Sequence, residues 1–76
     1  MKEYLFGIYR DGQYVKQEKA THHRSRENMY LFSRDADLKS GDEVVDTETN
    51  CKYKVAELRV VSRYDGESFL VKLKNI

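Results

Sequence analysis

The most conspicuous polar cluster in the sequence is His22-His23, followed closely by Arg24 and Arg26. Adjacent histidines on an extended segment point to opposite sides of the chain, so they seldom bind one metal ion together. No Cys-x-x-Cys or His-x-x-x-His spacing accompanies them to support zinc. We therefore expect no metal site. The four residues are candidates for a basic loop, which is either solvated or in contact with a phosphate or a partner protein.

Cys51 is the single cysteine of the chain. Paired with His22 or His23 it would have the residue types of a nucleophilic site. A lone cysteine in a small domain is more often a partly buried apolar filler. The sequence also lacks a Gly-x-Ser-x-Gly motif, a P-loop and a dinucleotide-binding fingerprint. The sequence therefore predicts no catalytic residues, no enzymatic activity and no cofactor.

Acidic residues gather in the middle of the chain, where Asp35, Asp37 and the run Gly41-Asp42-Glu43 faintly suggest a calcium loop. The spacing and the closing glutamate of an EF-hand are absent, so we expect an ordinary acidic turn. Residues 35–51 carry six acidic and one basic side chain, whereas the segments before and after each have three more basic than acidic residues. The chain is therefore polarised in charge, although its net charge is only +1.

Two Asp-Gly pairs, at 11–12 and 65–66, are the strongest signals for local structure. Each lies between segments rich in β-branched and aromatic residues, which are typical of strands. Asp-Gly suits a two-residue type I′ turn because both central residues need positive φ. The sequence therefore predicts two β-hairpins whose registers are set by these turns.

In the C-terminal hairpin, the register expected from the turn at 65–66 places five apolar side chains on one face, which we assign to the core. These are Leu58, Val60, Phe69, Val71 and Leu73. The expected facing pairs are Leu58 with Leu73, Val60 with Val71 and Ser62 with Phe69, and on the other face Arg59 with Lys72 and Arg63 with Ser68.

Like charges directly opposite each other, such as Arg59 and Lys72, destabilise a strand pair. Either the long side chains splay apart and the repulsion is tolerated, or the pair binds an anion over an apolar floor of Val61 and Leu70. Arg59, Arg63 and Lys72 are therefore candidate binding residues on a basic sheet face.

In the N-terminal hairpin, the same reasoning places Ile8 opposite Val15 on a core face that also holds Tyr4 and Phe6. On the other face it pairs Tyr9 with Tyr14, and such cross-strand aromatic pairs stabilise a hairpin by roughly 0.2–1 kcal/mol.

The centre of the chain is less regular. Segments 29–32 and 43–47 are predicted strands, the second entered through Gly41-Asp42. Tyr53 and Val55 differ in parity from Leu58, which a bulge near Ala56-Glu57 would reconcile. The segment 21–28 fits a short helix, capped by its threonine or serine, as well as it fits a loop. We expect one mainly β domain over residues 1–76, either a small barrel or a strongly coiled antiparallel sheet of five to seven short strands.

The stretch 30–61 resembles the opening of many SH3-like small barrels, in which an aromatic strand precedes Leu-x-x-Gly-Asp-x-Val-x-Val-x-Thr. The matching residues are Leu38, Gly41, Asp42, Val44 and Thr47. Asp46 and Glu48 are less typical, and Asn50 stands where glycine is common. The whole chain is similar to short proteins carried by phages and prophages of Gram-positive bacteria. The resemblance implies a fold and an origin, and it assigns no functional residue.

Two kinds of partner fit these features. A protein partner, or self-association, would use exposed strand edges and the many tyrosines. Nucleic acid would use the candidate basic residues with a stacking Tyr64 or Tyr9, although a pI of about 7.8 is low for such a domain. We therefore predict a non-catalytic protein-interaction module, with nucleic-acid binding as the alternative. No signal peptide or membrane segment is recognised, which predicts a cytoplasmic location, that of the host if the protein is phage-encoded.

Overall fold

Six antiparallel strands make up the fold, as the sequence predicts. The structure is a computed structural model, and it describes residues 3–23, 28–64 and 66–76. The strands are β1 (Glu3–Arg10), β2 (Gln13–His22), β3 (Met29–Ser33), β4 (Glu43–Asp46), β5 (Lys52–Arg63) and β6 (Gly66–Asn75). The described residues contain no helix.

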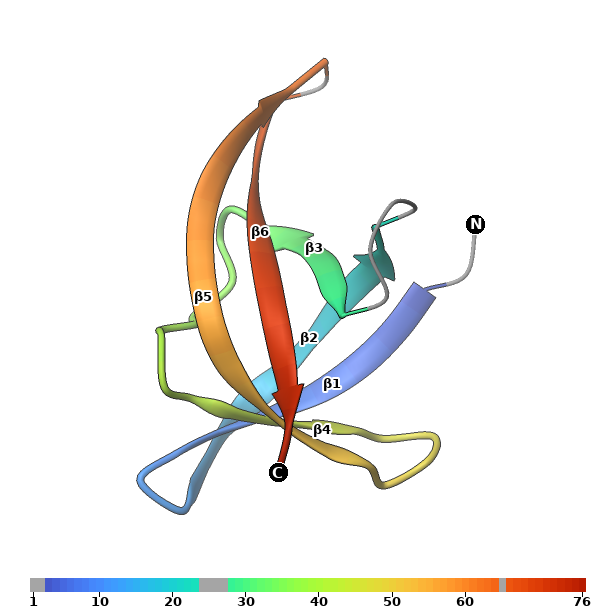
Figure 1. The fold of residues 1–76 in the computed structure, drawn as a ribbon, viewed down its shortest axis with the longest axis vertical. Helices are drawn as coiled ribbons and strands as arrows, with labels where there is room; N and C mark the ends of the chain where they lie inside the picture. Colours follow the sequence, from blue (N-terminus) through green and yellow to red (C-terminus); the bar gives the residue numbers. More distant parts are fainter. Residues whose placement is uncertain (1–2, 24–27, 65) are drawn as a thin grey trace.

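The strands close into a barrel in the order β1-β2-β3-β6-β5-β4 (Figure 1). Closure comes from the pairing of β1 with β4, in which Phe6 lies opposite Asp46 and Ile8 opposite Val44. The β5–β6 hairpin is the longest element and rises well beyond the other strands in Figure 1. The mainly β prediction is therefore confirmed as a closed barrel.

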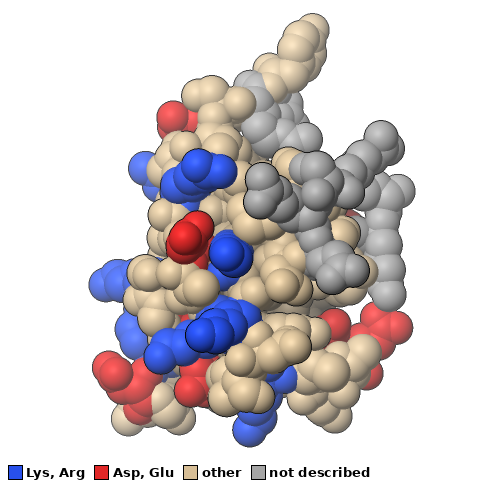
Figure 2. Space-filling model, in the orientation of Figure 1, with Lys and Arg blue, Asp and Glu red and all other residues tan. Residues whose placement is uncertain are grey.

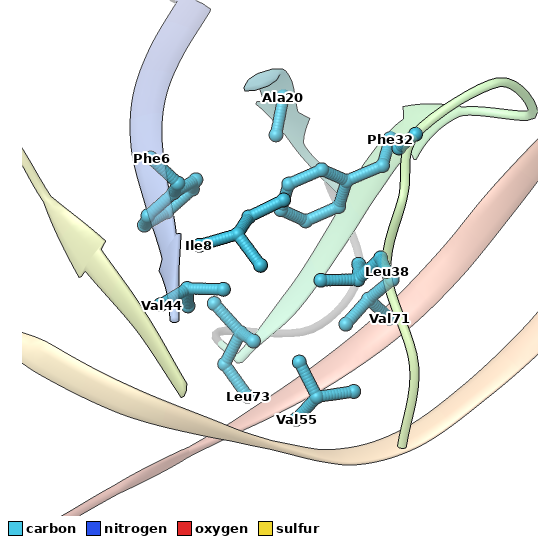
Figure 3. Close-up of a cluster of buried hydrophobic side chains, with 10 residues drawn as sticks. Phe6, Ile8, Ala20, Phe32, Leu38, Val44, Val55, Val71 and Leu73 are labelled. Atoms are coloured by element: carbon cyan, nitrogen blue, oxygen red, sulfur yellow. The ribbon is translucent and has the colours of Figure 1, made fainter. Parts of the chain in front are cut away.

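The core consists of apolar side chains that point into the barrel from every strand. Its largest fully buried members are Phe6, Ile8, Phe32, Val44, Val55, Val71 and Leu73. Ala36 and Leu38 come from the loop between β3 and β4 and join the same cluster. Figure 3 shows Leu38 beside Val71 and opposite Ile8. The loop thus supplies part of the inner packing.

The N-terminal turn confirms the Asp-Gly prediction, because Asp11 has φ 52° and Gly12 has φ 78°. Tyr9 lies opposite Tyr14, and their ring centroids are 5.5 Å apart in an edge-to-face arrangement. The expected pairing of Ile8 with Val15 is wrong. A bulge between Ile8 and Tyr9 shifts the register, so that Ile8 lies opposite Lys16.

The C-terminal hairpin has a different register from the expected one. Arg63 pairs with Gly66, so residues 64–65 connect the strands and Gly66 belongs to β6. The observed pairs are Leu58 with Val71, Val60 with Phe69, Arg59 with Leu70 and Ser62 with Glu67. The shift is two residues, which leaves every side chain on its expected face because strands alternate with period two. The hydrophobic pattern therefore cannot separate the two registers.

Val60 is a second correction in this hairpin. It lies on the predicted face, but it is 44% exposed because it belongs to the part of the hairpin that extends past the barrel. Leu58 and Phe69 are partly buried against the core. The predicted bulge is confirmed, because the register shifts between Val55 and Glu57.

The helix considered for segment 21–28 is absent where the structure describes that segment. Thr21 and His22 are the last residues of β2, and the His23 amide donates to the Met29 carbonyl at 2.8 Å. The intervening residues, 24–27, lie outside the described part of the chain. The first residues of the segment therefore belong to β2 and extend its pairing with β3.

Candidate binding face

Exposed cations on the outer surface of the β5–β6 hairpin include Lys54, Arg59, Lys72 and Lys74, which we call the basic face, and Lys52 lies on the same side at the start of β5. Lys54 lies directly opposite Lys74, while Lys72 lies opposite Glu57. Lys54 shares this face with Arg59 because the bulge at Ala56 changes the parity of β5 between them. Figure 2 shows Lys and Arg side chains gathered over β5 and β6, with an acidic side chain among them.

The structure places two of the three predicted residues on this face and alters their arrangement. Arg59 and Lys72 are not opposite each other, because the two-residue register shift puts Leu70 opposite Arg59. Arg63 pairs with Gly66 rather than Ser68 at the end of the hairpin, and its side chain lies outside the described part of the structure. The expected repulsion between opposed cations belongs instead to Lys54 and Lys74.

Like Lys19, Lys39 and Lys52, the cations of the basic face form no ion pair with another described residue, in contrast to Arg10, Lys16 and Arg34. Arg10 pairs with Asp42, and Lys16 pairs with Glu18 at 2.8 Å. Arg34 lies 3.9 Å from Glu67 and over the ring of Phe69. Within the described residues, the basic-face side chains form no ion pair. Their positive charge is therefore available to an external anion.

An apolar strip borders the basic face. Leu70 points outward between Arg59 on β5 and Leu31 on β3, yet it is only 8% exposed. Val61 lies on the same side, opposite Ser68. The predicted floor of Val61 and Leu70 is thus on the same side of the hairpin as Arg59, next to Leu31.

A shallow depression of about 260 Å³ continues this strip across β3 to β2. It forms where the β2–β3 ladder ends at Ala20 and Phe32 and the chain leaves the sheet after Ser33. Its polar lining comes from Lys19, Thr21, Ser33 and Ser68, with Glu3 at its edge. Hydroxyl and ammonium donors around an apolar base can bind the carboxylate and the backbone of a peptide.

Two carboxylates of the acidic segment, residues 35–51, form contacts within the barrel. Asp42 is buried and accepts hydrogen bonds from Arg10 Nε at 3.0 Å, Arg10 Nη2 at 2.7 Å and the Lys39 amide at 2.9 Å. Burial opposes the charged form of Asp42, but these bonds outweigh it and lower its pKa. Arg10 also reaches Asp37, and its own pKa is raised chiefly by its hydrogen bond to Asp42.

This arrangement explains the acidic turn that faintly resembles a calcium loop. Asp37 and Asp42 both form ion pairs with Arg10. Among the residues described, no group of three or more His, Cys, Asp or Glu side chains is suited to bind a metal ion. The Gly41 amide donates to the Val55 carbonyl, and the Val55 amide donates to the Asp42 carbonyl. The acidic turn thus fastens the loop before β4 to both β1 and β5.

The predicted basic loop is only partly described. His22 is half-buried at the end of β2, with its ring 5.1 Å from that of Tyr30. His23 follows the strand, while Arg24 and Arg26 lie outside the described residues. Cys51 is exposed between β4 and β5. The loop hypothesis therefore stays a prediction.

Sequence reasoning missed Lys54 and Lys74, the directly opposed pair. The signal that could have found them is the alternation Lys52-x-Lys54 and Lys72-x-Lys74, which places basic residues on one face of each strand. The expected register concealed the opposed pair, because it set Arg59 rather than Glu57 against Lys72.

Fold and surface together define a small six-stranded antiparallel barrel with a basic outer face on its longest hairpin. No protein-family model, curated protein or solved structure matches this chain significantly. In the part of the chain that the structure describes, no helix has the length and apolar character needed to cross a membrane.

Proposed function

We propose that this chain is a non-catalytic protein-interaction module of the cytoplasm that binds an acidic protein surface through its basic face. The observation that carries the proposal is the direct opposition of Lys54 and Lys74, with no counter-ion recorded for either among the described residues. Two facing ammonium groups repel each other in the free protein. An acidic partner would convert that repulsion into attraction.

The surroundings of the basic face favour a protein over a simple ion. The apolar strip at Leu31 and Leu70 adjoins it, and the hairpin tip exposes Val60 and Tyr64. Protein interfaces combine an apolar centre with arginine and tyrosine side chains. In addition, β5 pairs with β4 only through Lys52–Lys54, which leaves the farther edge of β5 without a strand neighbour in the described structure. That edge could accept a strand from the partner.

We further propose that the barrel is of the SH3-like class and that its partner is a host protein, as the resemblance to phage-borne small barrels implies. Two positions support the class, the matching residue Gly41 and the residue Asn50, which departs from the pattern. Gly41, with φ 93°, turns the chain into β4, and Asn50 has φ 62° in the turn where such barrels commonly have glycine. Asparagine is one of the few other residues that readily adopt this conformation.

The test uses an array of Asp/Glu-rich peptides beside the same peptides with Asn/Gln in place of the acids. We expect the labelled protein to bind the acidic series and K54Q/K74Q to lose most of that binding. The matched control is K16Q/K39Q, which removes the same total charge from β2 and the acidic loop and should bind like the wild type. Equal loss in both variants, or no preference for the acidic series, would overturn the proposal.

A second candidate function is the binding of single-stranded nucleic acid. The observation that favours it is a row of outward residues across neighbouring strands, running from Tyr14 and Tyr9 through Glu43 to Lys54 and Lys74. Aromatic platforms beside cations bind single strands. A salt titration with random-sequence DNA and RNA tests it: affinity that falls steeply with salt supports this candidate, and absence of binding at low salt eliminates it.

A further inference from the structure

One mouth of the barrel is lined by three tyrosines and an aspartate, which we call the tyrosine mouth: Tyr4 on β1, Tyr30 on β3, Asp46 on β4 and Tyr53 on β5. Their inward direction follows from the ladders. Asp46 lies opposite the core residue Phe6, Tyr53 opposite Val44, and Tyr30 opposite Val71, while Tyr4 precedes Phe6 by two residues. His22 on β2 also points inward at this end, because it lies opposite Tyr30 and follows the buried Ala20 by two residues, and its ring is 5.1 Å from that of Tyr30. The three tyrosines and Asp46 therefore share this end of the barrel with His22.

The rings of the tyrosine mouth are arranged around the buried ring of Phe6. Its centroid lies 5.3 Å from that of Tyr30 and 6.4 Å from that of Tyr53, both edge-to-face, and 6.1 Å from the stacked ring of Tyr4. Tyr4 and Tyr30 also meet edge-to-face at 5.4 Å. All three tyrosines are only half-buried, so each ring keeps part of its surface at the mouth. The negative face of such rings attracts cations.

Asp46 adds a carboxylate to these rings. It is 7% exposed, and its Oδ1 accepts a hydrogen bond from the Glu48 amide at 2.9 Å. No partner is recorded for Oδ2. Since no fully buried side-chain oxygen in the described residues lacks a partner, Oδ2 must retain some contact with solvent. It is thus an accessible negative oxygen at the rim of a mostly buried carboxylate.

The carboxylate lies close to the phenols. Burial raises the pKa of both Tyr30 and Tyr53, and the negative charge of Asp46 adds a smaller contribution to each. No ion pair is recorded for Asp46 within the described part of the chain, unlike the similarly buried Asp42, which Arg10 neutralises. A carboxylate that is mostly removed from water gains from a cation more than an exposed one does.

We infer that the tyrosine mouth binds an organic ammonium group, with the cation against the tyrosine rings and its charge balanced by Asp46. A cation beside aromatic faces and a carboxylate is the arrangement that recognises alkylated amines, because alkyl groups contact the rings while the charge is shared. The side chains of the tyrosine mouth point to the inner side of the barrel wall, whereas those of the basic face point to the outer side. The site does not depend on the acidic partner proposed above.

The probe is tetramethylammonium chloride, titrated into the intact protein and followed by aromatic-ring NMR, with sodium chloride at equal ionic strength as the reference. We expect saturable shifts of the Tyr4, Tyr30 and Tyr53 ring resonances, while the fully exposed Tyr64 stays unchanged. A capped Gly-Lys-Gly peptide and its trimethyl-lysine form are the second arm. Tighter binding of either peptide identifies a protein side chain as the ligand, and binding of tetramethylammonium alone identifies a small free amine.

Two variants make the inference falsifiable. Asp46→Asn keeps an oxygen for the Glu48 amide and should weaken tetramethylammonium binding about tenfold, as loss of a charged partner does. Tyr53→Leu keeps apolar volume but removes a ring, and should weaken binding several-fold, while the control Tyr14→Leu on the outer surface has no effect. The inference is overturned if the folded wild type shows no saturable shift, or if Asp46→Asn binds as the wild type does.

Discussion

The two ends of β4 each carry a buried aspartate, and the two have opposite surroundings. Asp42, which precedes the strand, is held by two nitrogens of Arg10 and by the Lys39 amide. The carboxylate of Asp46, the last residue of the strand, accepts one hydrogen bond, from the Glu48 amide, and forms no ion pair with a described residue. Two carboxylates of similar burial thus differ in their partners: the first is paired with Arg10, whereas the second forms no ion pair with a described residue.

Among the substitutions that test this contrast, Arg10→Met should cause the largest loss of stability. It leaves the buried Asp42 carboxylate without its cation, so the free energy of unfolding should fall clearly, although solvent around the partly exposed Arg10 position screens part of the loss. Urea denaturation measures the loss. The control is Lys16→Met, which breaks the more exposed ion pair with Glu18 and should change stability much less. Equally small losses in the two variants would show that the Arg10–Asp42 pair does not stabilise the barrel.

Lowering the pH should reduce the stability of the fold through protonation of Asp42. The pKa of Asp42 is lowered in the folded state, so its contribution to stability is complete above the unfolded value of about 3.9 and is lost as the pH falls through the folded value. Urea midpoints measured between about pH 5 and 2 should therefore fall more steeply for the wild type than for Asp42→Asn. Parallel profiles would mean that other carboxylates cause the acid sensitivity.

The smallest effect is expected at Asp46. Asp46→Asn keeps an oxygen for the Glu48 amide and breaks no ion pair, so the unfolding free energy should change by less than about 1 kcal/mol. The same substitution at Asp42 should cost clearly more. Thermal or urea unfolding of the two variants side by side measures the difference, and a larger loss at Asp46 would reverse the comparison.

Features governed by neighbouring residues could be predicted from the sequence. The turn at Asp11-Gly12 requires two positive φ angles, and the bulge at Ala56 follows from a change of apolar parity. Both predictions are confirmed. The basic face was predicted in part: Arg59 and Lys72 lie on it, but their pairing is wrong, because a slip of two residues keeps the same pattern of buried and exposed side chains.

Features that depend on distant residues could not be predicted in this way. Arg10 and Asp42 come from opposite sides of the barrel closure, and no local spacing relates them. The tyrosine mouth likewise unites β1, β3, β4 and β5 only once the strand order is known. In the sequence, Tyr30 and Tyr53 resemble ordinary strand aromatics, and Asp46 is merely one of six acidic residues in its segment.

The pairing of β1 with β4 also has a consequence for how the chain folds. The β1–β2 and β5–β6 hairpins each join strands that are close in the sequence, and such hairpins form on the order of microseconds. The β1–β4 and β3–β6 ladders must instead bring together strands separated by much of the chain, and the entropy of that closure is lost before any contact is gained. Joining the two preformed hairpins should therefore limit the folding rate, with the β5–β6 hairpin exposing its apolar inner face until the barrel closes.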